Sequence, residues 1–136
     1  MNVKSLIEEF YINDDFDCEQ EIQWYNSWDL LSVNRFDIAF KIFYLNYKDK
    51  CPELSEELYK THIYAITNGT FKEFGNLDKG SFKSFINEFN GVFNSLKKNQ
   101  FDTTTSLIPL TKEGGILLNG AHRTAAAINL GIKVPT

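Results

Sequence analysis

Apolar residues recur at steps of three and four through most of the first hundred positions, which is the spacing of amphipathic helices. The clearest run consists of Phe82, Phe85, Ile86, Phe89, Phe93 and Leu96. Ser81 stands directly before this run and is a preferred helix N-cap residue. We therefore expect a helix that begins after Ser81 and buries the phenylalanine stripe.

Two more helices are predicted between residues 33 and 69. The first has a stripe of Phe36, Ala39, Phe40, Phe43 and Tyr47, which we expect to be its buried face. The second begins at Pro52, because proline suits the first turn of a helix, and ends at Asn68-Gly69. Its apolar side is expected to carry Leu54, Leu58, His62 and Ala65 or Ile66.

The chain before residue 33 is also predicted to be helical. A short helix is expected over 3–10, followed by a second from Glu19 whose face carries Ile22, Trp24, Tyr25, Trp28 and Leu31. Trp24 and Trp28 lie one turn apart on this helix. We expect them to fill the core or an interface.

The pattern changes after Phe101. The stretch TTTSLIPL favours a strand, KEGG a turn and ILL a second short strand. An alanine-rich helix follows and is stopped by Gly131, and another strand begins over 132–135. The expected fold is an α-rich α/β protein, with a helical region at 1–100 and a compact β-β-α-β unit at 101–136 that together form one globular domain.

The composition of the chain argues against several classes of function. Fourteen basic and eighteen acidic residues give a net charge of −4, which disfavours nucleic acid as the main partner. No apolar run is long enough for a membrane span, and the N-terminus does not resemble a secretory signal. Cys18 and Cys51 are far apart and outside any zinc-binding pattern. We expect a cytoplasmic protein with no metal site.

Several charged residues have simple structural interpretations. Asp14, Asp15, Asp17, Glu19 and Glu21 are expected in a solvated loop, because a calcium loop would need a glycine at its bend. Arg35 and Asp37 are expected to form an ion pair, with a supporting role at a ligand pocket as the alternative. His62 is expected to be a hydrogen-bonded core residue.

The turn between the last strand pair and the last helix carries the candidate chemistry. Asn119 and Gly120 suit a reversal of direction, and the first helical residues have backbone N–H groups without intrahelical partners. Such a helix start attracts anions, and the Arg123 guanidinium matches phosphate oxygens. His122 adds a donor that titrates near neutral pH. The predicted phosphate-binding residues are Asn119, Gly120, His122, Arg123 and Thr124.

The segment ILLNGAHRTAAAINLGIKVP resembles the motif of the ParB/sulfiredoxin-like fold, in which a strand runs into Gly-x-His-Arg and an alanine-rich helix. SLIPLTKEGGILL is similar to the two-stranded lead-in of that fold. The resemblance covers residues 101–136 and implies a cradle for nucleotide phosphates. If a nucleotide binds, the resemblance implies ATP or CTP with Mg²⁺.

The departures from that family limit what is carried over. Ala121 stands where sulfiredoxins have cysteine, which argues against sulfinic-acid reduction. Asn119 and Ala121 replace an aspartate and a histidine of the family's free-serine kinases. Partition proteins have a second arginine in place of His122. If the chain is an enzyme, the expected chemistry is phosphoryl transfer to a small molecule, with Glu113 or Asp102 as the general base.

Two functions other than phosphate binding are also considered from the sequence. The chain is also consistent with a non-catalytic ParB-like interaction module, completed by a protein partner or a second copy of itself. Nuclease or DNA-partition activity ranks last, because the net charge is negative and no reader helix follows the motif.

Overall fold

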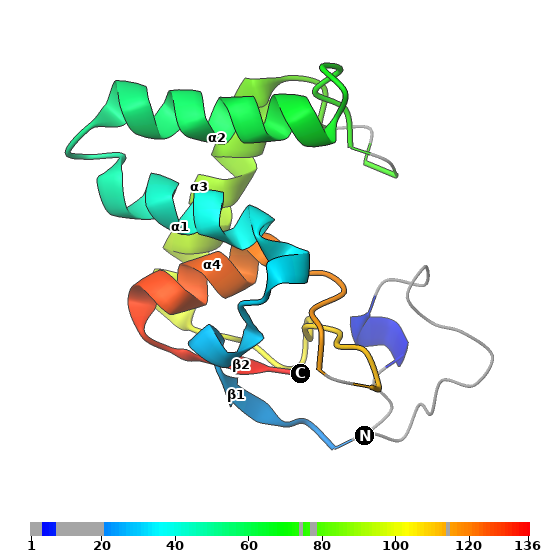
Figure 1. Ribbon diagram of the computed structural model, residues 1–136. Helices are drawn as coiled ribbons and strands as arrows, with labels where there is room; N and C mark the ends of the chain where they lie inside the picture. The colour runs from blue at the N-terminus through cyan, green and yellow to red at the C-terminus, as the bar shows by residue number, and fades with distance from the viewer. Residues whose placement is uncertain (1–3, 8–20, 74, 77–78, 114) are drawn as a thin grey trace.

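The computed structural model describes residues 4–7, 21–73, 75–76, 79–113 and 115–136 (Figure 1). Within these residues the fold is mixed α/β, with four α-helices and a small antiparallel sheet. The helices are α1 (Asp37–Tyr47), α2 (Pro52–Ile66), α3 (Phe82–Asn99) and α4 (Ala121–Leu130), and the strands are β1 (Trp24–Asn26) and β2 (Lys133–Pro135). Short 3₁₀ turns cover η1 (Lys4–Leu6), η3 (Ser27–Leu30) and η4 (Val33–Arg35).

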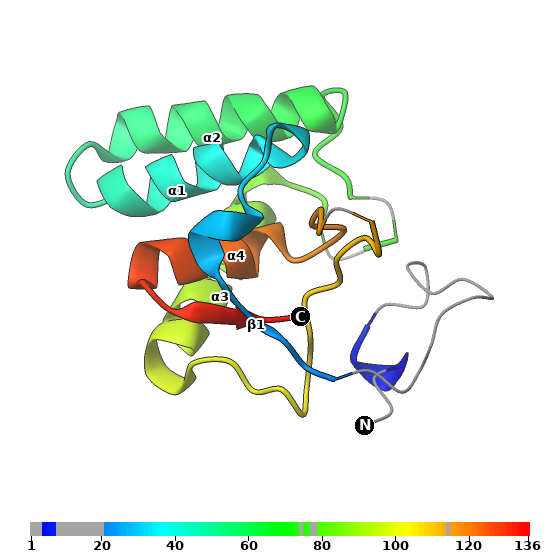
Figure 2. The ribbon, with the colours of Figure 1, turned by 60° about the horizontal axis from the view of Figure 1, so that its bottom comes forward.

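Helix α4 is the central element of the structure. The α1–α2 hairpin lies on one side of it and α3 crosses its other side (Figures 1 and 2). Ala125, Ala126 and Ala127 are completely buried at this junction. Their small side chains let the neighbouring helices approach closely, so the core spans both the predicted helical region and the segment after residue 101.

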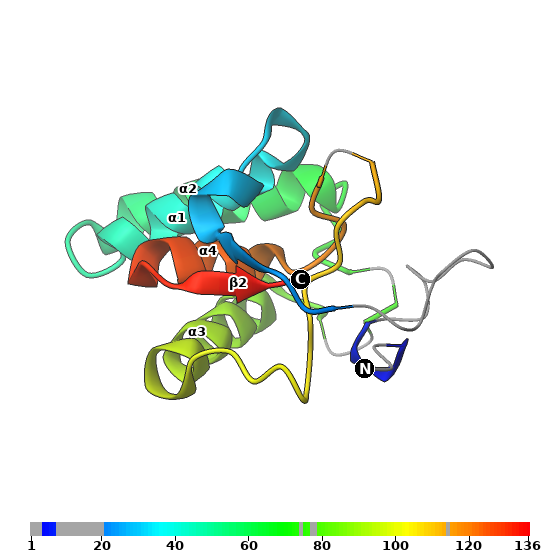
Figure 3. The same cartoon turned by 90° about the horizontal axis from the view of Figure 1, so that it is seen from below.

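The sheet joins residues that are far apart in the sequence. β1 and β2 pair antiparallel, with Tyr25 opposite Val134. An extended segment at 107–111 lies beside β2, because the Ile108 N–H donates to the Pro135 carbonyl at 3.1 Å. A single bridge then pairs Leu110 with Leu117. This layer lies against α4, as Figure 3 shows, and the expected strand at the end of the chain is confirmed.

The predicted helix from Glu19 to Leu31 is wrong where the structure describes it. Residues 24–26 form β1, and Ser27–Leu30 make only one 3₁₀ turn. Trp24 and Trp28 are 50% and 60% exposed, so neither fills the core. Pairing with β2 overrides the local helical spacing here, because a strand far along the chain satisfies the backbone groups of 24–26.

Helices α1 and α2 were predicted correctly, but their buried faces were not. On α1 the buried residues are Ile38, Lys41, Tyr44 and Leu45, whereas Phe36 is 60% exposed. On α2 they are Ser55, Tyr59, His62 and Ile63, whereas Leu54 is 54% exposed. His62 was expected on the α2 face and is buried there. Hydrophobic spacing missed Lys41 and Tyr59, which are buried because their polar groups are paired within the protein.

The predicted signals at the ends of α2, α3 and α4 are confirmed. The Ser81 hydroxyl accepts the Ser84 N–H, and the Ser84 hydroxyl accepts the Ser81 N–H, which completes a capping box. Phe85, Phe89 and Leu96 are buried along α3. Pro52 occupies the first turn of α2, and α4 ends at Gly131 in the left-handed conformation.

The helix expected over 3–10 falls mostly outside the described residues, within which Lys4–Leu6 form a 3₁₀ turn. The acidic run is likewise outside them, except for Glu21, which is exposed. In the part of the chain that is described, no helix has both the length and the apolar character required to cross a bilayer.

Enlarging the alanine face of α4 is expected to destabilise the protein. Ala126→Leu adds three carbon atoms to a site with no exposed surface, which should lower the free energy of unfolding by about 1–3 kcal/mol. Urea unfolding followed by circular dichroism measures this change. Ala39→Leu on the exposed side of α1 is the matched control and should change stability little. Equal effects of the two substitutions would contradict the proposed close packing.

Candidate functional site

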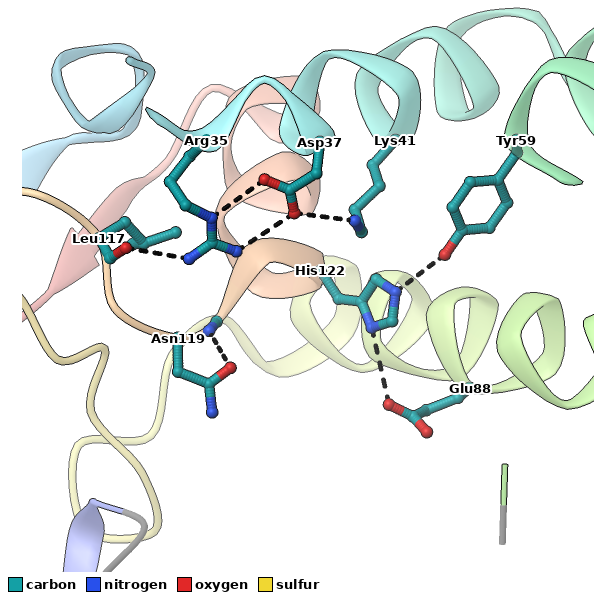
Figure 4. A network of polar contacts seen from close by, with 9 residues as sticks. Arg35, Asp37, Lys41, Tyr59, Glu88, Leu117, Asn119 and His122 are labelled. Carbon is teal, nitrogen blue, oxygen red and sulfur yellow. Dashed lines mark hydrogen bonds and ion pairs between the residues drawn. The ribbon is translucent and has the colours of Figure 1, made fainter. Parts of the chain in front are cut away.

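A cavity of about 830 Å³ lies at the start of α4. It is walled by the beginning of α1, by the end of α2, by α3, by described residues of the 67–81 loop and by the turn that precedes α4. Four of the five predicted phosphate-binding residues line it, namely Asn119, Gly120, His122 and Arg123. Figure 4 shows how side chains from α1, α2, α3 and α4 converge at this place.

The turn into α4 requires glycine at its last position. Gly120 is the N-cap, with a left-handed φ of 90°, and a Cβ there would lie 3.1 Å from Cγ1 of Ile108. The Asn119 side-chain oxygen accepts the Gly120 N–H at 2.6 Å. The first helical hydrogen bond runs from the Thr124 N–H to the Gly120 carbonyl, and no side chain caps the helix. The N–H groups of residues 121–123 therefore have no intrahelical acceptor.

Both ring nitrogens of His122 lie next to protein groups. Nε2 is 2.9 Å from the Tyr59 hydroxyl, and Nδ1 is 3.6 Å from Oε1 of Glu88. The adjacent carboxylate favours the proton on Nδ1, so Nε2 accepts a hydrogen bond from Tyr59. The ring also stacks on Phe89, with centroids 4.7 Å apart. The imidazole thus connects α4 to α2 and α3.

Burial determines the protonation states of His122 and Tyr59. It lowers the pKa of His122, although the adjacent Glu88 carboxylate acts in the opposite direction. Burial also raises the pKa of the Tyr59 phenol, so this hydroxyl keeps its proton and serves as the donor. The His122 side chain is held neutral by its surroundings and is positioned inside the protein.

Arg123 connects the cavity to the extended segment before it. Its Nη1 donates to the Ser106 hydroxyl at 2.8 Å and to the Leu107 carbonyl at 3.2 Å. The fifth predicted binding residue, Thr124, is completely buried and is not part of the cavity wall. Its hydroxyl has no hydrogen-bond partner among the described residues.

The expected ion pair between Arg35 and Asp37 is confirmed, and both residues line the cavity. Arg35 donates twice to Asp37, at 3.0 and 3.2 Å, and once to the Leu117 carbonyl at 3.0 Å. Lys41, one turn further along α1, donates to the same carboxylate at 3.1 Å. Burial raises the pKa of Asp37, but Arg35 and Lys41 outweigh it and bring the pKa to about 2.

A second charged group comes from the 67–81 loop and α3. The almost fully buried ammonium of Lys79 lies 2.7 Å from Glu73 and 2.8 Å from Glu88. Contact with the His122 ring lowers the pKa of Glu88 to about 2, with help from Lys79 and against the effect of burial. This carboxylate is therefore ionised at neutral pH.

These charges suit electrostatic binding better than proton abstraction. A carboxylate whose pKa is about 2 is a weak general base at neutral pH. The two carboxylates predicted as bases, Asp102 and Glu113, do not line the cavity. Asp102 accepts hydrogen bonds from the backbone and hydroxyl of Thr104, and Glu113 is exposed on its turn. Their catalytic role stays a prediction.

Five residues at or beside the cavity were not predicted from the sequence, namely Lys41, Tyr59, Glu73, Lys79 and Glu88. Lys41 had a detectable pattern, because it follows Asp37 by four residues inside an otherwise apolar helix. Tyr59 and Glu88 lie at ordinary helical positions that become significant only when α4 is placed between their helices. Nothing in the local sequence indicates that Lys79 reaches back to Glu73.

His62 is a core histidine, but it is not hydrogen-bonded as expected. Its ring is 4% exposed and stacks on Phe40 with centroids 4.6 Å apart. Its Nε2 has no hydrogen-bond partner among the described residues. Burial lowers its pKa to about 4, so the ring is neutral at pH 7.

Comparisons with known proteins do not assign the chain to a family: no family model, curated protein or solved structure matches it. Within the described residues, no cluster of three or more His, Cys, Asp or Glu side chains is arranged to hold a metal ion. The ParB-like character of residues 101–136 stays a prediction.

The buried histidines predict a loss of stability in mild acid. Between pH 6.5 and about 4 the unfolded chain binds more protons at His62 than the folded protein does, so stability falls as the pH is lowered. His122 acts in the same direction. His62→Leu removes one titrating group and should make the free energy of unfolding depend less on pH between 7 and 4.5. Urea unfolding at several pH values tests this, and an unchanged slope would show that His62 does not contribute.

Proposed function

We propose that this protein binds a phosphorylated small molecule, with nucleotides as the first class to test, in the cavity at the start of α4. The supporting observation is the composition of that cavity. Its wall carries four cationic side chains, Arg35, Lys41, Lys79 and Arg123, and three carboxylates, Asp37, Glu73 and Glu88. The surplus positive charge lies beside a helix start that no side chain caps.

The helix start supplies the geometry for an anion. Backbone N–H groups of residues 121–123 point out of the first turn, and the helix dipole places partial positive charge there. Arg123 adds a guanidinium in the same turn. In this arrangement the backbone N–H of His122 donates to the anion, while its ring holds α4 against α2 and α3.

The size and remaining walls of the cavity fit a ligand larger than free phosphate. Its volume of about 830 Å³ falls within the usual range for small-molecule sites. Ile63, Phe85, Val92 and Leu118 add apolar surface to the wall. A phosphorylated molecule with a base or another apolar part would use both kinds of surface. If turnover occurs, phosphoryl transfer is the reaction that such a site supports, because it depends on positioning and charge.

One observation favours the second candidate, a non-catalytic interaction module. The α1–α2 hairpin leaves several large apolar side chains exposed, including Phe36, Tyr47 and Leu54. Exposed apolar surface of this kind is typical of protein contacts. Sedimentation analysis with and without ligand separates the two functions, because a module should assemble without any nucleotide.

Ligand binding is expected to raise the thermal midpoint. A ligand at one hundred times its dissociation constant stabilises the native state by about 2.7 kcal/mol, which corresponds to several degrees in a domain of this size. Wild-type protein should be scanned with ATP, CTP, GTP and inorganic phosphate, with and without Mg²⁺. Arg123→Ala should lose most of the shift.

Two controls define the result. Lys98→Ala removes an exposed cation that does not line the cavity, so it should retain the full shift. Arg123→Ala also removes the contacts with Ser106 and Leu107, so its midpoint without ligand must be measured and its fold checked by circular dichroism. A shift that is the same in both variants would place the ligand elsewhere, and the absence of any shift in the wild type would contradict the proposed function.

A further inference from the structure

We propose that the cavity contains a second anion subsite, formed by Arg35 and Lys41, and that the ligand therefore carries two anionic groups, as a diphosphate does. This inference rests on the proposed function, because the first anionic group is the one bound at the start of α4. The ligand is then of the diphosphate class, and Arg35 and Lys41 bind it from outside the NGAHR turn (residues 119–123).

Lys41 has unused hydrogen-bonding capacity in a buried place. Its side chain is 5% exposed and lines the cavity. An ammonium group has three N–H donors, and Asp37 accepts one of them at 3.1 Å. No second hydrogen-bond acceptor for this group is found among the described residues, where its other contact is with the Tyr59 ring at 6.0 Å. Leaving a buried cation incompletely paired costs free energy, which an anionic ligand would recover.

The local charge balance points to the same place. Asp37 is the shared partner of two cations, Arg35 and Lys41, so this group has a surplus of positive charge. Lys79 has the opposite arrangement, because two carboxylates, Glu73 and Glu88, surround its single ammonium. Positive charge is therefore in excess at the α1 side of the cavity as well as at Arg123.

The charges around Lys41 agree with an excess of positive charge at the α1 side of the cavity. Burial lowers the pKa of Lys41, and the positive charges of Arg35 and Lys79 lower it further, against the effect of Asp37. The charge of Lys41 also reaches the start of α4, where it contributes to the lowered pKa of His122. An anion beside Lys41 would reduce this mutual repulsion among the cations.

The two subsites share one cavity. In Figure 4, Arg35 from the end of η4 and Lys41 from α1 extend toward the side of α4 where Asn119 and His122 lie. Arg35 is held there by three hydrogen bonds, two to Asp37 and one to the carbonyl of Leu117, which lies two residues before Asn119. Two linked anionic groups can thus contact α1 and the first turn of α4 together. Linking them makes the second contact intramolecular, which raises affinity above that of a single anion.

Isothermal titration calorimetry with orthophosphate and pyrophosphate, at constant ionic strength, tests the inference. In the wild type, pyrophosphate should bind at least about tenfold more tightly than orthophosphate. Lys41→Met keeps the length and apolar stem of the side chain but removes its charge. It should abolish most of the advantage of pyrophosphate and leave orthophosphate binding at the α4 subsite. Lys98→Met, which removes an exposed cation outside the cavity, should retain the wild-type ratio.

The outcomes separate the two proposals. Equal affinity for the two anions in the wild type, or an equal loss for both in Lys41→Met, would overturn the second subsite while leaving the first. No binding of either anion to the wild type would contradict the proposed function as well. If Lys41→Met does not fold, NMR spectra of the wild type with ¹³C-labelled lysine replace it. Pyrophosphate should then shift the Lys41 ε-methylene signal, and an unchanged signal at saturation would overturn the inference.

Discussion

The contacts of the His122 ring determine how the helices of this protein fit together. One nitrogen meets Tyr59 of α2, the other faces Glu88 of α3, and the ring plane stacks on Phe89. A single side chain at the second position of α4 thereby connects three helices. Because the cavity lies between these same elements, its shape depends on the ring remaining neutral and in place. The histidine of the NGAHR turn is best understood as the residue that positions the site.

The charged side chains around this junction form two groups, which differ in their ratio of cations to carboxylates. On the α1 side one carboxylate serves two cations, whereas beside α3 two carboxylates serve one lysine. Ion pairs in low-dielectric surroundings gain little net stability, because desolvation offsets much of their attraction. Their position on the wall of the cavity suits the proposed ligand binding. The first group comes from one short stretch of chain, whereas the second joins the loop before α3 to α3 itself, so its electrostatics appear only when the chain is folded.

The sequence predicted the parts of this structure that depend on local chemistry. The start of α3 at Ser81, the end of α4 at Gly131 and the turn at Gly120 follow from capping and from backbone freedom, which act over a few residues. The prediction failed where distant contacts decide the outcome. β1 exists because β2 pairs with it, and α1 buries Lys41 instead of Phe36 because Asp37 and the aromatic ring of Tyr59 accommodate the ammonium. The candidate site was found in part, since Arg123 and His122 belong to a local motif whereas Lys79 and Glu88 reach it through tertiary structure.

The pairing of β1 with β2 has a consequence for how the protein folds. Trp24 and Pro135 are partners although about 110 residues separate them, so closing this contact carries a large entropic cost that local helix formation does not. During synthesis α1, α2 and α3 leave the ribosome before α4, and until α4 arrives the surfaces that will cover its alanine face have no partner. The cavity is therefore among the last features to form. A substitution that slows the docking of α4 would prolong the exposure of these apolar surfaces, and with it the risk of aggregation, even if the folded protein were equally stable.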